Sequence, residues 1–432
     1  MNRTFLCLGM ILASLIGIGG RGEEIPHLAA PGRHPPRIVK LLAPRVFAPR
    51  FGFEYENPND PALQAMRKNY RLDEVVAGAT NDWEIICRLM AWTTRYVGDL
   101  NERNRGGPGC IPASEKEIQD ALAAGRSPPP KGASGLDLMK QLESGSTGAC
   151  GTFNRVFQSA LAAYGIMSRD LNIGPAWHAV TDVWSDHWGK WIFMDSMTCG
   201  YFESAGVPLT AFEIQQLRRA GVKPQMVFVD NGEMVRRCQW EKWVAEYVDR
   251  EFQCVDTVMA ANHLSPSWEE SDFINGVERG APRLYVTPFD IGRFMGSEIK
   301  IEGINRLFVT PEEHAFNNVF ITRCHYVVTD DPSDVYWPLN VVEVRLPSKG
   351  RFLTVYPDVP LTLVTHAPFL DALQVSTDGG KTWNEVTTAP EVEGLRHAAF
   401  QWTVKPGMNT FQARVKSAQG RLGRLSTLEV MW

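Results

Sequence analysis

The chain has 432 residues, of which 44% are hydrophobic and 22% are charged, and its formal net charge is −5. A chain of this length has room for two or three domains with a sizeable core. The composition excludes a disordered, collagen-like or polytopic membrane protein, and the pI of about 6.0 argues against a protein that coats nucleic acid.

Residues 1–22 have the pattern of a signal peptide. Arg3 places a positive charge ahead of an uncharged run from Phe5 to Ile18, and small residues follow. The run is shorter than the roughly 20 apolar residues that a membrane-spanning helix needs. We therefore expect cleavage near residues 20–23, no stable membrane span, and a mature protein that is secreted or periplasmic.

Such a compartment favours disulfides. An odd number of cysteines remains after the signal peptide, so at least one thiol is left over. These residues are Cys87, Cys110, Cys150, Cys199, Cys238, Cys254 and Cys324. No pair has C-x-x-C spacing, so we expect no metal site, and nothing in the sequence indicates a nucleotide or organic cofactor.

Residues 23–79 are expected to form an extended N-terminal lead-in. A helix is predicted over 80–100, because Asn81 can cap it and its apolar residues fall on one face. Residues 101–135 read as a long loop with a short helix around 114–124. A loop of that length is either a lid or a tolerated surface insertion.

A second helix is predicted over 152–165, where apolar residues form one stripe and Gly165 suits the C-terminal cap. Two short strands, WHAVTDVWS and KWIFMD, follow as a hairpin. Two more helices are predicted over 207–221 and 240–252. Together these elements define an expected core domain over 80–283.

Strand patterns replace helix patterns beyond this core. We expect a β-rich domain over 284–360 and a small immunoglobulin-like β-sandwich over 361–432, since short strand-like runs alternate there with turn residues. The fold class predicted for the whole chain is therefore α+β.

The segment STDGGKTW, residues 376–383, matches the Asp-box pattern. The pattern is carried by Ser376, Asp378, Gly380, Thr382 and Trp383. Serine and aspartate side chains bond the turn in this β-hairpin device, and the glycines supply positive φ angles. We assign it no catalytic role.

The segment GSTGACGTFN, residues 145–154, places Cys150 at the start of the 152–165 helix. Backbone N–H groups there lack partners within the helix, and the helix dipole adds partial positive charge, so both favour a thiolate. Gly148 and Gly151 leave room for a substrate carbonyl. The free N–H groups, that of Gly151 included, are suited to bind an oxyanion.

His178 stands at the head of the first hairpin strand and Asp195 at the tail of the second. A register that places them opposite each other needs a two-residue loop at 186–187 or a four-residue loop at 185–188, and both lengths are common. Their Cβ atoms would then lie roughly 4.5–5.5 Å apart. An aspartate beside a histidine fixes its tautomer and supports the imidazolium. His187 is a competing base, but it falls in the predicted loop.

With these residues the sequence resembles the transglutaminase-like superfamily, whose core is similar to that of papain-like cysteine proteases. The resemblance covers roughly residues 80–200 and rests on the cysteine at a helix start followed by YGIMSR, WHAVTDVW and KWIFMD. It implies that Cys150, His178 and Asp195 occupy the catalytic positions. The superfamily includes cross-linkers, deamidases, peptidases, glycopeptide amidases and inactive members, so it implies acyl transfer rather than one substrate.

Trp92 is the candidate for the additional oxyanion donor that the family places upstream of its cysteine. Trp177 and Trp184 are candidates for a substrate groove, with a place in the core as the alternative. We expect a secreted cysteine enzyme that acts on a protein, peptide or glycopeptide and not on nucleic acid. The alternative is a non-catalytic binding or scaffold protein with the same fold, in which Cys150 is disulfide-linked.

Overall fold

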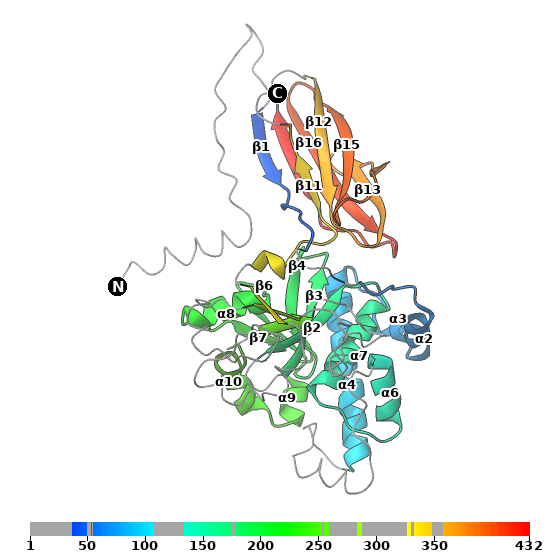
Figure 1. Cartoon of the computed structure of the whole chain (residues 1–432), viewed down its shortest axis with the longest axis vertical. Coiled ribbons are helices and arrows are strands. Elements are labelled where there is room, and N and C mark those ends of the chain that lie inside the picture. Colours follow the sequence, from blue (N-terminus) through cyan, green and yellow to red (C-terminus); the bar gives the residue numbers. More distant parts are fainter. Residues whose placement is uncertain are drawn as a thin grey trace, which may run out of the picture. The chain divides into compact units, whose positions relative to one another are not determined.

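The computed structural model describes residues 37–49, 53, 55–106, 134–173, 178–252, 255–258, 283–286, 326–329, 332–347 and 357–432. The chain divides into two units (Figure 1). The first comprises Met1–Ala48, Asp186–Lys190 and Trp337–Trp432, and the second comprises Pro49–Ser185 and Trp191–Tyr336. Among the described residues, no helix is both long and apolar enough to cross a bilayer.

The first unit contains a five-stranded sheet in the order β1–β17–β16–β13–β14 and a three-stranded sheet in the order β11–β12–β15. Its strands are β1 (Arg37–Leu42), β11 (Val342–Arg345), β12 (Asp358–Thr365), β13 (Leu370–Ser376), β14 (Asn384–Val386), β15 (Arg396–Thr403), β16 (Met408–Ser417) and β17 (Ser426–Met431). Both sheets contribute to one hydrophobic core, with Leu363 and Trp402 from one and Phe411 and Leu428 from the other.

The first unit draws strands from three separate segments of the chain. β1 lies in the expected lead-in of 23–79 and pairs with β17, whereas β11 lies in the expected β-rich segment of 284–360 and pairs with β12. β12 reaches into the segment expected as a β-sandwich over 361–432, and β13 to β17 lie within it. Pairing between segments that are distant in sequence leaves no local signal, so the expected boundaries do not follow these units.

The Asp-box turn has the expected contacts. The Ser376 hydroxyl donates to Asp378 Oδ1 at 2.8 Å and accepts from the Gly380 N–H at 2.9 Å. The Asp378 carboxylate accepts from Thr382 through both its N–H and its hydroxyl. Gly379 and Gly380 have φ angles of 75° and 86°, which explains the two adjacent glycines.

The second unit is built on a nine-stranded sheet in the order β10–β9–β8–β2–β3–β4–β5–β6, with β7 paired to β5. Its strands are β2 (Ser168–Ile173), β3 (His178–Ser185), β4 (Lys190–Asp195), β5 (Gly200–Ser204), β6 (Val207–Pro208), β7 (Gln225–Phe228), β8 (Val255–Val258), β9 (Arg283–Val286) and β10 (Tyr326–Thr329). β2 runs antiparallel to both of its neighbours, whereas β9 and β10 run parallel.

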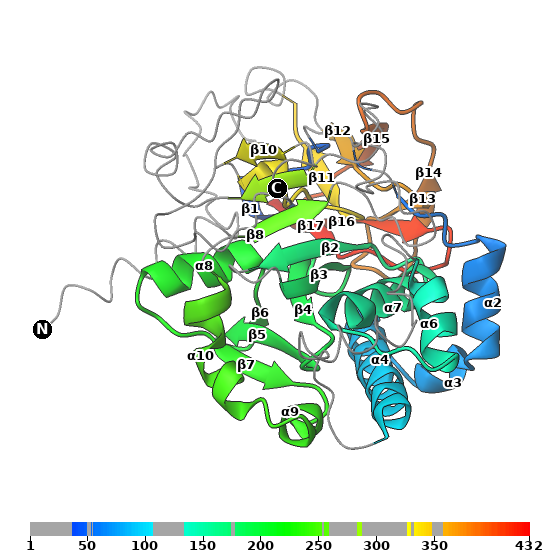
Figure 2. The same cartoon turned by 60° about the horizontal axis from the view of Figure 1, so that its bottom comes forward.

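Helices cover both faces of the central strands in this unit. They are α2 (Pro61–Asn69), α3 (Leu72–Val75), α4 (Asp82–Arg105), α6 (Gly135–Glu143), α7 (Cys150–Ala162), α8 (Ala211–Arg219), α9 (Glu233–Arg237) and α10 (Glu241–Glu251), with a 3-10 turn at Pro332–Asp334. Figure 2 shows α4, α6 and α7 on one side of β2, β3 and β4, and α8 and α10 on the other. Helices and mainly antiparallel sheets make this a mixed α+β protein.

Capping residues mark the ends of α4 and the start of α8. The Asn81 side chain accepts from the Glu84 N–H at 3.0 Å, so the predicted cap of α4 is confirmed. α4 continues past the expected end at residue 100, to Gly106 in a left-handed conformation. A reciprocal capping box of Thr210 and Glu213 starts α8.

Two expectations need correction, and two others fall outside the described residues. The lead-in of 23–79 is not extended throughout, because Asp60 caps α2 and Pro61 begins it, which is a standard start signal. Of the long loop expected over 101–135, residues 101–105 belong to α4 and residue 135 to α6. The signal peptide and the short helix expected around 114–124 lie outside the described residues.

Candidate active site

Cys150 is the first residue of α7 and is half-buried. The residue before it, Ala149, offers no side-chain hydrogen bond to the helix. The first N–H groups bonded inside the helix are those of Thr152 and Phe153, which donate to the Ala149 carbonyl at 2.9 and 3.2 Å. The N–H groups of Cys150 and Gly151 come before them and have no partner within the helix, and that of Gly151 donates to the Cys150 sulfur.

The two glycines beside Cys150 have different surroundings. The Gly148 backbone is clamped by Asn101 of α4, which donates to its carbonyl at 2.9 Å and accepts from its N–H at 2.8 Å. A Cβ added at Gly148 would lie 2.5 Å from the Thr152 side chain, whereas one added at Gly151 meets no described atom within 4 Å. The chain is therefore closely packed before Cys150 and open just after it.

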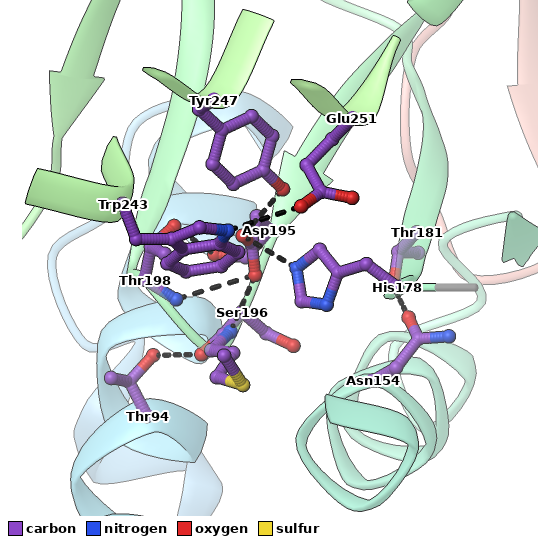
Figure 3. Close-up of polar contacts among 11 residues, drawn as sticks. Thr94, Asn154, His178, Thr181, Asp195, Ser196, Thr198, Trp243, Tyr247 and Glu251 are labelled. Atoms are coloured by element: carbon purple, nitrogen blue, oxygen red, sulfur yellow. Dashed lines mark hydrogen bonds and ion pairs between the residues drawn. The ribbon is translucent and has the colours of Figure 1, made fainter. Parts of the chain in front are cut away.

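β3 and β4 are neighbours in the sheet, and they carry His178 as the first residue of β3 and Asp195 as the last of β4. The loop between them is 186–189, one residue later than the predicted four-residue loop. His178 Nε2 lies 3.0 Å from Asp195 Oδ2, and both side chains are buried (Figure 3). The structure thus joins these two predicted residues directly.

The Asp195 carboxylate is held on both oxygens. Its Oδ1 accepts from the backbone N–H groups of Met197 at 2.9 Å and Thr198 at 3.3 Å. Its Oδ2 accepts from the Tyr247 hydroxyl at 2.7 Å as well as from His178. Burial opposes the charge, but His178 and these donors hold the pKa of Asp195 below its ordinary value.

Cys150 and His178 form a coupled pair. Burial disfavours a charged imidazole, but Asp195 and Cys150 outweigh it and raise the pKa of His178 from 6.5 to about 10. Burial likewise disfavours a thiolate, but hydrogen bonds from His178 and from the N–H groups of Ala179 and Gly151 lower the pKa of Cys150. The arrangement therefore favours a thiolate–imidazolium pair near neutral pH.

The other described cysteines differ from Cys150. Burial is the largest cause that raises the pKa of Cys87 and of Cys199 to about 12, so both remain protonated thiols. Cys150, Cys87 and Cys199 are free, whereas Cys238 is disulfide-bonded. Cys150 is thus the one described cysteine that combines a free thiol with a lowered pKa.

Helix α10 forms an aromatic wall beside His178. The rings of Trp243 and Tyr247 meet the imidazole edge-on, at centroid distances of 5.2 and 5.9 Å. Trp243 Nε1 donates to Glu251 Oε1 at 3.1 Å. The sequence predicts this helix over 240–252 without indicating a role for it, although Trp243, Tyr247 and Glu251 recur along it every four residues and so share one face (Figure 3).

A buried polar cluster attaches α7 to the sheet. Asn154 of α7 donates to Asp170 of β2 and accepts from the Thr181 hydroxyl of β3. Gln158 Nε2, one turn further along α7, lies 3.3 Å from Asp170 Oδ1. These contacts fix the helix that carries Cys150 against the strand that carries His178. The sequence carries no local signal for these contacts, because Asn154 and Gln158 lie beside the apolar stripe of the helix and their partners lie on strands.

Trp92, the expected oxyanion donor, belongs to a different cluster. Its ring stacks on Tyr96 at 5.3 Å and meets Tyr70 at 6.1 Å. It is two residues from Thr94, about 200° around α4, and the Thr94 hydroxyl donates to the Ser196 carbonyl at 2.6 Å. The structure therefore groups Trp92 with two tyrosines and does not bring it to Cys150.

Three further aromatic and histidine candidates have other surroundings or fall outside the described residues. Trp184 is 2% exposed and packs against Trp191 at 6.0 Å, so it is a core residue and does not line a groove. Trp177 lies outside the described residues. His187 is exposed in the 186–189 turn, as expected. Within the described ranges, no group of three or more His, Cys, Asp or Glu residues is arranged to hold a metal ion.

Comparisons with known proteins add little to this geometry. No protein-family model and no curated protein matches the chain. Among solved structures, the chain is similar to a red sea bream transglutaminase, at 12% identity and a TM-score of 0.20, over 85% of this chain and 71% of that one. Identity and TM-score this low support no conclusion about function, which has to come from the residues of the site.

Proposed function

We propose that this chain is a secreted transglutaminase-like cysteine enzyme that cleaves or transfers the acyl group of an amide through a thioester on Cys150. The observation that carries the proposal is the chain of contacts from the Cys150 thiol to His178 and from His178 Nε2 to Asp195 at 3.0 Å. A nucleophile, a base and a group that orients the base are the parts that covalent acyl transfer requires.

In the first half of the proposed reaction, the Cys150 thiolate attacks the amide carbonyl carbon and the carbonyl electrons move to oxygen. In the proposed reaction the Cys150 N–H, which has no partner within the helix, stabilises this oxyanion. The Gly151 N–H joins it, because it is released from the sulfur once the sulfur has bonded to carbon and lost its charge. The imidazolium of His178 then gives its proton to the amide nitrogen as the C–N bond breaks. An amine leaves, and the acyl group remains on sulfur as a thioester.

In the second half, water or an amine attacks the thioester carbonyl. His178 takes the proton from the attacking group, the C–S bond breaks, and Cys150 leaves as the thiolate. Water as acceptor gives a carboxylic acid, whereas an amine gives a new amide. Asp195 stays ionised throughout, because its contacts already lower its pKa.

Three observations support this proposal over a non-catalytic scaffold. Cys150 is a free thiol rather than a half-cystine. Gly151 leaves open space where a carbonyl must approach, among the described residues. The disulfide at Cys238 suits an oxidising compartment, in keeping with an exported enzyme. A protein, peptide or glycopeptide is the substrate class that we propose.

The test is labelling with a thiol-reactive amide-mimic probe at pH 7. We expect the wild type to be labelled at Cys150 and the Cys150→Ala variant to lose at least nine-tenths of the label. Cys87→Ala is the matched control, because Cys87 is a free thiol with a raised pKa, and it should label like the wild type. Equal labelling of wild type and Cys150→Ala would overturn the proposal.

A second assay separates the two acceptors. A peptide amide is incubated with the wild type with and without a fluorescent primary amine. Release of acid alone indicates a hydrolase, and incorporation of the fluorophore indicates a transferase. Loss of both signals in Cys150→Ala is expected in either case.

A further inference from the structure

We propose that Tyr247 is a positioning residue of this site, whose hydroxyl orients Asp195 and sets the pH at which His178 loses its proton. The inference rests on the Cys150–His178 pair that the proposed function uses. It assigns a role to α10, the helix for which the sequence suggested none.

Tyr247 binds the same carboxylate oxygen of Asp195 as His178 does. Its hydroxyl lies 2.7 Å from Asp195 Oδ2, the same oxygen that lies 3.0 Å from His178 Nε2 (Figure 3). Two donors therefore share one carboxylate oxygen. Electron density that Tyr247 draws from this oxygen is not available to the imidazolium, so the two contacts are coupled.

The packing around the Tyr247 ring holds its hydroxyl in place. The Tyr247 side chain is 0% exposed, and its ring packs against Phe193, Phe202 and Phe252 at centroid distances of 6.5, 5.7 and 6.1 Å. A ring fixed on three sides holds its hydroxyl at one place. Asp195 Oδ1 is bound separately by backbone N–H groups, so Tyr247 and His178 are the side chains that hold Oδ2.

The surrounding charges keep Tyr247 a neutral donor. Burial and the negative groups Asp195, Glu251 and Cys150 raise its pKa well above the ordinary value. The titratable groups that act on His178 are Asp195 on β4 and Cys150 on α7. Within the described chain, Tyr247 is therefore a hydrogen-bond donor that does not itself titrate across the working range of the pair.

The direction of the effect follows from these contacts. The tyrosine hydroxyl stabilises the Asp195 carboxylate most when His178 is neutral, because an imidazolium already withdraws charge from Oδ2. Removing the hydroxyl therefore destabilises the neutral-imidazole state more than the imidazolium state. The pKa of His178 should rise, and the alkaline limb of the activity profile should move to higher pH.

The experiment is Tyr247→Phe, which keeps the ring and removes the hydroxyl. We expect His178 ring NMR to titrate at a higher pH than in the wild type. We also expect the alkaline limb of kcat to move the same way, and kcat at pH 7 to fall about tenfold, as the loss of one charge-assisted hydrogen bond predicts. A lowered kcat with both titrations unchanged would show a merely structural role and overturn the proposal.

Tyr164→Phe is the matched control. The Tyr164 hydroxyl also donates to a carboxylate, that of Asp73 at 2.9 Å, in the same unit, and Tyr164 is not among the groups that shift the pKa of His178 or of Asp195. Its kcat profile and the His178 titration should stay as in the wild type. If the wild type neither labels nor turns over, the proposed function fails, whereas the NMR titration of His178 in Tyr247→Phe still decides the role of Tyr247.

Discussion

At the scale of single residues, the difference between Cys150 and the other free thiols is a matter of neighbours. All three are at least partly buried, and burial alone raises a thiol pKa. Cys87 and Cys199 have acidic side chains nearby, which add to that effect. Cys150 has an imidazolium and two backbone donors instead, and these reverse it.

Asp195→Asn tests this account. The amide keeps the size of the carboxylate but loses the charge that raises the pKa of His178. The pKa of His178 should fall, the imidazolium should become scarcer, and the pKa of Cys150 should rise. Alkylation of Cys150 by iodoacetamide at acidic pH should then slow about tenfold for each unit of that rise.

The rate is measured from pH 4 to 9 by mass spectrometry of the alkylated peptide. Cys87 and Cys199 serve as internal controls, because their pKa values of about 12 keep them protonated over this range. An acid limb that stays in place in Asp195→Asn would contradict the coupling.

Cys150, His178 and Asp195 could be proposed from the sequence because each stands at the end of an element whose pattern is clear locally. Tyr247 could not, because its partner is 52 residues away and nothing in the helix pattern indicates which strand its face meets. The surroundings of Trp184 were equally hidden, since its burial depends on the whole sheet.

At the scale of elements, the start of α7 depends on two glycines with opposite demands. Gly148 is clamped by Asn101 and crowded by Thr152, whereas Gly151 faces open space. A methyl group at each position should therefore have a different consequence.

Gly148→Ala should lower the melting temperature, since its Cβ would overlap the Thr152 side chain and overpacking costs about 1–3 kcal/mol. Gly151→Ala should fold at least as well as the wild type, because alanine is the better helix residue. It should nevertheless reduce kcat/KM several-fold, since the methyl fills the space beside Cys150. Calorimetry and the amide assay check both variants; equal melting temperatures and equal kinetics would refute the distinction.

Elements with local start and stop signals could be predicted from the sequence. The β4 strand matched its predicted segment, and caps at Asn81 and Thr210 marked the starts of α4 and α8. The hairpin loop was displaced by one residue, yet His178 and Asp195 still meet. The predicted register assumed regular pairing of the two strands. Side chains at strand ends have enough freedom to reach each other even when the register differs.

At the scale of the whole molecule, the first unit is assembled from distant segments. Val342 and Val344 of β11 are 4% exposed or less and belong to the shared core, although they lie before the expected sandwich boundary at 361. The three-stranded sheet has β11 at its edge, paired with β12. Sequence patterns identified the strands but not this assembly, because pairing partners are not encoded locally.

Two fragments test the assembly. Residues 337–432 retain β11, whereas residues 361–432 lack it and start inside β12. The longer fragment should melt cooperatively, and the shorter one should show a weaker or no transition, because it exposes the core side of the remaining strands. Circular dichroism during heating measures both. Identical cooperative melting would show that β11 contributes nothing to the stability of the unit.

The alanine at position 149 has a consequence for engineering. A serine or aspartate there would accept a hydrogen bond from an N–H group at the start of α7 and stabilise the fold by about 1 kcal/mol. Selection for heat resistance alone would therefore favour such a replacement, and the new oxygen would then occupy the place that the proposed reaction needs for the acyl oxygen. The chain lacks a stabilising cap at this helix end, and variant libraries selected for thermal stability should leave position 149 unchanged.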